Sequence, residues 1–327
     1  MNGSTLSIID PHVHLFDIEN GHYDWLKTDN APFWPQKYLI NRTYVDNALY
    51  LEEPLHLAAY IHIEAGYDNE SGERELAMLE EKASIPMRTM GYVDITLPHD
   101  DFLYALGKQS EYRSSRGIRY ILDGSLNEIK AILENENSYK NLAFLGKHKG
   151  TFELQLDVKN TELVVLVYAF FNRLPELQVV LNHAGFAPLL EKEESNQASI
   201  YAHQLDFTNW QANLLLLAKL PKVAVKCSGF EMSLLNEDKD AIGAVIQYTN
   251  EDVIAVVKHC IDAFGSDKVM MASNFPLCLF SMSYQNYWET ALGALQHLFK
   301  DKDENQREAL MTALLHDNAA RIYGIES

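Results

Sequence analysis

Two histidines separated by a single residue, His12 and His14, stand at the end of the apolar segment IIDPHVHLFD (8–17). Side chains alternate along a β-strand, so Asp10 and both histidines are expected to share one face of such a strand. Imidazole groups bind divalent metals, transfer protons near neutral pH and donate hydrogen bonds. The pair therefore indicates a metal site, a substrate site or, as the plainer alternative, two packed core histidines.

Eight apolar segments have the length and composition of buried strands. They span residues 7–14, 57–65, 87–95, 116–122, 151–157, 177–185, 222–229 and 268–276. Amphipathic helical patterns lie between several of them, at residues 73–83, 161–174, 209–220 and 251–265. Strands that alternate with helices favour a parallel sheet, and eight such units predict a (β/α)₈ TIM barrel, one domain over residues 1–327. An open dinucleotide-binding sheet is disfavoured because no G-x-G-x-x-G turn follows an early strand.

The catalytic groups of such a barrel lie at the carboxyl ends of its strands, and polar side chains interrupt the apolar pattern there. Beyond the first strand these side chains are His62, Glu64, Arg119, Gln155, Asp157, His183, Lys226, Ser228 and Asn274. An unpaired buried polar group costs about 1–3 kcal/mol, so groups that recur at one end of a barrel should be paired or face a wet pocket. We interpret them as one site, at which His12, His14, His183 and Asn274 converge.

Composition limits the partners of this chain. The 327 residues carry a formal net charge of −19, and no basic patch would attract nucleic acid or an anionic membrane. No run of about 18 apolar residues could span a bilayer. The three cysteines are too scattered for a disulfide framework and form no C-x-x-C pair. We therefore expect a cytoplasmic protein that acts on a small molecule and has no nucleic-acid or membrane partner.

Eight short motifs occur in an order that resembles the amidohydrolase superfamily, in particular the lactonase and metal-dependent hydrolase branch of the amidohydrolase-2 group. They are HVH, YDWL, GIRYIL, FELQL, LNHAG, KCSG, SNFPLC and NAARIYG, and they extend over nearly the whole chain. The resemblance implies hydrolysis of sugar-acid lactones or pyrone dicarboxylates, with decarboxylation of aromatic acids in more distant relatives. It also implies that His12, His14 and His183 are catalytic and, where a divalent metal is present, bind it.

The chain departs from this family at two carboxylates. Asn274 stands in SNFP where the family usually carries aspartate, and Asn182 precedes His183 where the family usually has an Asp-His pair. The family aspartate takes a proton from the attacking water, which an amide cannot do. Three neutral imidazoles and a water could still complete a tetrahedral zinc site, although we expect zinc to bind weakly or not at all. Some relatives work without metal, their histidines polarising the lactone carbonyl.

The candidates for substrate binding are Arg119, His62, Gln155 and Lys226. A guanidinium offers several donors in one plane, so Arg119 could hold a substrate carboxylate or hydroxyl group; the alternative is an ion pair with Asp94 or Asp157. His62 could instead be a hydrogen-bonded core residue, or could act with Glu64 in place of the missing carboxylate.

The function predicted from these residues is hydrolysis of a small cyclic ester, a sugar-acid lactone or related carboxylated lactone, by water attack on its carbonyl. Two alternatives remain open at this level. The barrel could bind a small molecule with impaired catalysis, as the two asparagines suggest, or it could decarboxylate its substrate.

Overall fold

The computed structural model describes residues 5–189, 197–235 and 246–326. Its eight strands form one parallel sheet in sequence order. The strands are β1 (Leu6–Val13), β2 (Leu55–Ile63), β3 (Met87–Tyr92), β4 (Ser115–Ile121), β5 (Thr151–Gln155), β6 (Gln178–Leu181), β7 (Val223–Cys227) and β8 (Val269–Met271). A bridge between Val13 and Phe275 joins the first strand to the segment after the last. The predicted (β/α)₈ TIM barrel is confirmed.

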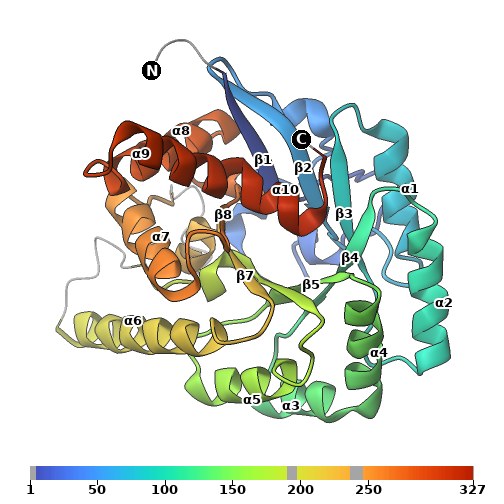
Figure 1. The fold of residues 1–327 in the computed structure, drawn as a ribbon. Helices are drawn as coiled ribbons and strands as arrows, with labels where there is room; N and C mark the ends of the chain where they lie inside the picture. Colours follow the sequence, from blue (N-terminus) through green and yellow to red (C-terminus); the bar gives the residue numbers. More distant parts are fainter. Residues whose placement is uncertain (1–4, 190–196, 236–245, 327) are drawn as a thin grey trace.

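Helices surround the strands (Figure 1). The α-helices are α1 (Glu73–Lys82), α2 (His99–Ser110), α3 (Leu126–Glu134), α4 (Glu136–Lys147), α5 (Thr161–Phe171), α6 (Gln197–Leu217), α7 (Asn250–Phe264), α8 (Tyr284–Leu298), α9 (Glu304–Thr312) and α10 (Asn318–Tyr323). Short 3₁₀ helices are η1 (Asp24–Leu26), η2 (Pro35–Leu39), η3 (Asp46–Leu49), η4 (Asn182–Gly185), η5 (Phe230–Leu234) and η7 (Leu277–Phe280), and a π-helical segment, η8 (Ala313–Asp317), joins α9 to α10. No helix within the described ranges is long and apolar enough to cross a membrane.

Local sequence signals explain where several helices begin and end. Reciprocal capping boxes start α3, through Ser125 and Glu128, and α7, through Thr249 and Asp252. Gly265 follows α7 at φ 87°, a conformation that favours glycine, and confirms the end predicted there. Such caps satisfy backbone groups that a helix end leaves unpaired.

The apolar core has two parts. A small inner cluster contains Ile9, Ala59, Ile61, Ile63, Met90, Val180, Ala224 and Met270 of the strands, together with Ala319 and Tyr323 of α10. A larger cluster joins the strands to the surrounding helices. Within the barrel β5 and β7 also contribute Glu153 and Lys226, both fully buried, so the interior beside the aliphatic cluster is charged.

Strands β6 and β8 end earlier than predicted, and this changes how the site is presented. The chain leaves β6 at Leu181, and His183 then has a left-handed backbone with φ 54°. Asn274 has φ 58°, three residues beyond the end of β8. Because left-handed residues break the extended ladder, turns rather than strands carry His183 and Asn274.

Candidate active site

The His12 and His14 side chains meet inside the barrel, with their Nε2 atoms 3.2 Å apart. Nδ1 of His14 lies 2.8 Å from the carbonyl oxygen of Ile63, which can only accept, so Nδ1 carries the hydrogen. For neutral rings, Nε2 of His14 is then the acceptor and Nε2 of His12 the donor. Nδ1 of His12 in turn faces the Lys226 Nζ at 3.5 Å. One consistent set of protons satisfies this row of groups.

His183 packs against the same pair from η4. Its ring centroid is 4.6 Å from that of His12, and its Nδ1 is 3.0 Å from the Ser228 Oγ. Gly229 follows at φ 65°, and a Cβ there would lie 2.6 Å from the His183 Nδ1. The KCSG motif therefore supplies both a polar partner and the space that the imidazole occupies.

All three imidazoles are neutral at neutral pH. Burial is the main cause that lowers the pKa of His12, His14 and His183 well below the usual value. The positive charges of Lys226, for His12, and Arg119, for His14 and His183, lower it further. Neutral imidazoles can each donate one hydrogen bond and accept another.

Asp10 does not share the face of these histidines. Its carboxylate accepts hydrogen bonds from Ser273 and from the Tyr284 hydroxyl of α8, the latter at 3.1 Å. The pairing of β1 with β2 shifts register between Asp10 and Val13, which breaks the simple alternation expected for this segment. Burial raises the pKa of Asp10 to about 6, opposed by these hydrogen bonds. Asp10 thus ties β1 to the segment that carries Asn274.

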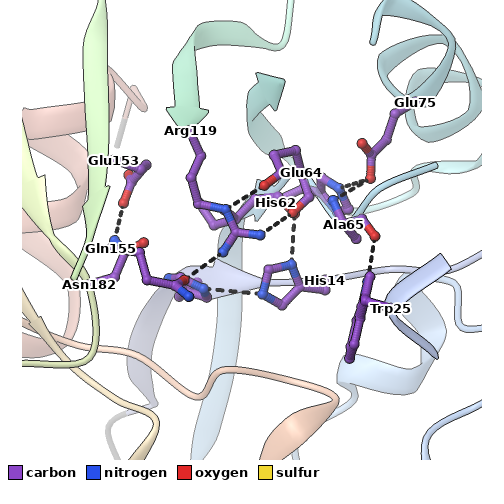
Figure 2. A network of polar contacts seen from close by, with 12 residues as sticks. His14, Trp25, His62, Glu64, Ala65, Glu75, Arg119, Glu153, Gln155 and Asn182 are labelled. Atoms are coloured by element: carbon purple, nitrogen blue, oxygen red, sulfur yellow. Dashed lines mark hydrogen bonds and ion pairs between the residues drawn. The ribbon is translucent and has the colours of Figure 1, made fainter. Parts of the chain in front are cut away.

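Arg119 lies between Glu64 and Gln155 (Figure 2). Its Nε donates to the Glu64 carboxylate at 2.7 Å, its Nη2 to the Glu64 carbonyl oxygen at 2.6 Å and its Nη1 to Gln155 Oε1 at 3.1 Å. This pairing replaces the alternative considered from the sequence, an ion pair with Asp94 or Asp157. Three of the five guanidinium N–H groups are used, and two remain for a substrate.

Lys226 forms a buried ion pair deeper in the barrel. Its Nζ is 2.7 Å from the Glu153 carboxylate, and both side chains are fully buried. Glu153 also accepts hydrogen bonds from the Asn182 amide and, at 2.6 Å, from the Tyr323 hydroxyl. Burial lowers the pKa of Lys226 to about 8, opposed by Glu153. The lysine therefore lies beside His12, and its ammonium is already paired with Glu153.

His62 is not hydrogen-bonded to His12, His14 or His183. Its Nε2 donates to Glu75 of α1 at 3.0 Å, and its Nδ1 accepts from the Leu15 N–H at 3.2 Å. Glu75 also accepts from the Ala65 N–H (Figure 2). His62 therefore connects β2 to α1 and to the segment after β1, on the side that faces the helices.

Glu231, a buried carboxyl group next to Asn274, is not among the site residues predicted from the sequence. Asn274 Nδ2 donates to Glu231 Oε1 at 2.8 Å, and Glu231 is fully buried on η5. Asn182 donates to Glu153 in the same way, so both asparagines at the unusual positions contact a buried glutamate. The signal available in the sequence is a charged residue directly after the KCSG motif and Phe230.

A model of the amidohydrolase family matches residues 9–325. The chain belongs to this family. A protein of Sinorhizobium fredii (strain NBRC 101917 / NGR234), the uncharacterised protein y4mH, is 31% identical over 98% of this chain and 100% of its own length. The L-fucono-1,5-lactonase of Burkholderia multivorans (strain ATCC 17616 / 249) is 24% identical over 84% of each chain. A crystal structure of an amidohydrolase from Burkholderia multivorans with bound zinc has a TM-score of 0.68 and 22% identity, covering 98% of this chain and 99% of its own. The resemblance inferred from the eight motifs is confirmed.

Amidohydrolases commonly hold a divalent metal. The residues of this site have the chemistry of metal ligands, but they are not arranged around a common point. His12, His14 and His183 are neutral, as metal ligands must be. Within the described ranges, however, no three His, Cys, Asp or Glu side chains are placed to hold a metal together. The nearby carboxylates Glu64 and Glu153 are paired with cations. The site as folded favours hydrogen bonding by its imidazoles.

Proposed function

We propose that this amidohydrolase hydrolyses a small cyclic ester, a sugar-acid lactone or a related carboxylated lactone, by attack of water on the ring carbonyl. The observation that carries the proposal is the buried group of three neutral imidazoles, His12, His14 and His183. Similarity to an L-fucono-1,5-lactonase supports this substrate class.

The imidazoles would stabilise the charge that develops on the carbonyl oxygen. If the Ser228 hydroxyl donates to Nδ1 of His183, Nε2 of that ring carries the hydrogen and can donate to the oxygen. Preorganised donors in a buried site stabilise an oxyanion strongly, and removing one such donor costs about 10²- to 10³-fold in rate. His12 and His14 would complete the polar surroundings of the carbonyl.

Arg119 would orient the substrate through its two remaining N–H groups, which can bind a carboxylate or ring hydroxyls. Glu64 and Gln155 keep the guanidinium plane fixed, so less conformational freedom is lost when the substrate binds. This arrangement favours a lactone that carries a second oxygen-rich group.

If a divalent metal such as zinc binds, His12, His14 and His183 are the residues that would hold it, and it would polarise the carbonyl as a Lewis acid. The Lys226 ammonium beside His12 opposes a second positive charge at that position. The donor set and its surroundings therefore favour weak metal binding.

The three cysteines are free thiols, which supports a reducing compartment such as the cytoplasm. The charge of −19 and the burial of the site's side chains support a small molecule, and neither nucleic acid nor a membrane, as the partner.

A pH-indicator assay against a panel of five- and six-membered sugar lactones, including L-fucono-1,5-lactone, tests the proposal. The wild-type protein should release acid from at least one lactone, and His183→Ala should lose about 10²- to 10³-fold in rate. A ligand bound without turnover would favour the binding-protein alternative. Release of carbon dioxide from an aromatic acid would favour decarboxylation.

A further inference from the structure

Glu231 belongs to the loop that supports His183. The preceding residues, Ser228 and Gly229, contact the His183 ring, and η5 begins at Phe230. Glu231 itself is fully buried and receives a hydrogen bond from Asn274, the residue at the position where the family usually carries aspartate. A carboxyl group is therefore present one side chain away from the position that lacks it.

Two oxygen atoms of this pair have no partner among the residues that the structure describes. Oε2 of Glu231 and Oδ1 of Asn274 are buried and make no hydrogen bond within the part of the chain that the structure describes. An ionised carboxylate can only accept, whereas the acid form also donates a hydrogen. An incoming water or substrate hydroxyl can satisfy the same atoms. A buried acceptor without a partner is costly and calls for an explanation, and a catalytic role or a bound water is one such explanation.

The surroundings of Glu231 leave its carboxyl group free to change protonation state. Among the described residues, the titratable groups that interact with it are Tyr248, Cys278 and Tyr287, and all three are uncharged at neutral pH because burial raises their pKa values. None of these groups is a cation. Burial raises the pKa of Glu231 to about 7, opposed by the hydrogen bond from Asn274. Glu64, by contrast, is fixed in an ion pair with Arg119.

We propose that Glu231 is the acid–base group of this site, that it supplies the carboxyl function absent at position 274, and that Asn274 holds it in place. This inference rests on the proposed lactone hydrolysis. The Glu231 carboxylate accepts a proton from water as the water oxygen bonds to the carbonyl carbon. It then gives that proton to the ring oxygen as the carbon–oxygen bond of the ester breaks. One water is consumed, and the product is an open-chain hydroxy acid.

The first test compares the pH dependence of kcat/KM for wild type and Glu231→Gln on the lactone with the highest turnover. Wild-type kcat/KM should rise with pH through about 7, the pKa of Glu231, and level off at higher pH. Glu231→Gln should lose about 10²- to 10⁴-fold and show no such rise. Glu75→Gln is the matched control, because Glu75 is also a buried glutamate but contacts His62 on the helix side. It should keep the wild-type rise whatever its effect on stability.

A second test moves the carboxyl group. Glu231→Gln/Asn274→Asp keeps one amide and one carboxyl in contact, and it should recover at least about tenfold of the rate lost in Glu231→Gln. If Glu231→Gln does not fold, the wild-type profile decides alone, and a flat profile between about pH 5 and 9 would overturn the inference.

Other outcomes separate the two proposals. If the wild type hydrolyses a lactone and Glu231→Gln keeps the same pH profile of kcat/KM, the role of Glu231 is overturned but the proposed function stands. If Glu64→Gln loses the pH-dependent rise of kcat/KM and Glu231→Gln keeps it, Glu64 transfers the proton. That result also overturns the role of Glu231. If the wild type hydrolyses no lactone, the proposed function fails and the inference falls with it.

Discussion

A single amide at position 274 changes the chemistry of its neighbours. Asn274 cannot take a proton, but its Nδ2 donates to Glu231, and its own backbone lies next to Ser273, which binds Asp10. An aspartate at this position would instead repel the Glu231 carboxylate. The two residues are therefore compatible as an acid–amide pair, and a change at one is expected to change the pKa of the other.

Asn274→Asp should move the pH profile of lactone hydrolysis upward. The substitution places a second carboxyl about where an amide nitrogen now lies 2.8 Å from Glu231 Oε1, and two carboxyls this close do not both ionise readily. The rise of kcat/KM should shift by about one pH unit or more. Asn274→Asp in a Glu231→Gln background lacks the second carboxyl and should show no upward shift. A faster enzyme with an unmoved profile would mean that the introduced carboxyl acts alone.

Zinc should bind weakly to the wild-type protein. Its candidate ligands are three neutral imidazoles without a carboxylate, and the Lys226 ammonium faces His12 at 3.5 Å. Elemental analysis after extended dialysis without chelator should find well below one equivalent. Lys226→Met removes the nearby cation and should retain more zinc, whereas Lys258→Met, at an exposed position on α7, should not. One tightly held equivalent in the wild type would contradict this prediction.

At the scale of elements, the buried ion pair of Lys226 and Glu153 joins β7 to β5, and the Tyr323 hydroxyl adds α10. Lys226 of this network lies beside His12, with its Nζ 3.5 Å from the His12 Nδ1. Such a pair gains little over an apolar pair of the same shape, but breaking it leaves a buried charge without a partner. The network therefore fixes positions more than it adds stability.

Lys226→Met should lower the free energy of unfolding by about 3–5 kcal/mol, because it leaves the Glu153 carboxylate buried and unpaired. Lys226→Met/Glu153→Gln should recover part of this loss. Urea unfolding followed by circular dichroism measures all three proteins. Lys258→Met, which breaks an exposed pair with Asp262, serves as the control and should change stability little. If Lys226→Met and Lys258→Met lower the free energy of unfolding equally, burial does not determine the cost of breaking an ion pair.

For the whole molecule, pH acts on stability in two opposite directions. Burial raises the pKa of Asp10 to about 6 and of Glu231 to about 7, so the folded state binds these protons more tightly than the unfolded state. Their contribution is complete at low pH and is lost as the pH rises through those values. The histidines have lowered pKa values, so their contribution is present above the unfolded value and is lost as the pH falls below it.

Comparison of wild type with Glu231→Gln isolates the contribution of Glu231 to the pH dependence of stability. The stability of Glu231→Gln relative to wild type should increase as the pH rises from about 4.5 to about 7, by an amount on the order of 3 kcal/mol, because only the wild type loses the proton. Urea unfolding of both proteins at several pH values measures the difference. A constant difference over this range would mean that Glu231 is ionised in the folded protein already at low pH.

Local patterns along the chain were enough to predict the barrel, the family and the polar residues that approach the site. Strand and helix periods are local properties, so their alternation could be identified without coordinates. The motifs HVH and LNHAG likewise identified His12, His14 and His183, which the fold places next to one another.

The pairing of the polar groups, by contrast, could be known only from the folded chain. Both faces of a strand in a parallel barrel are buried, so the apolar pattern of β2 could not reveal that His62 faces α1. The partner of Arg119 depends on which side chain of the neighbouring strands reaches it, and that is Glu64. Glu231 lies 43 residues before Asn274, and no local signal connects them. Their contact exists because parallel strands β7 and β8 bring the segments that follow them to the same end of the barrel.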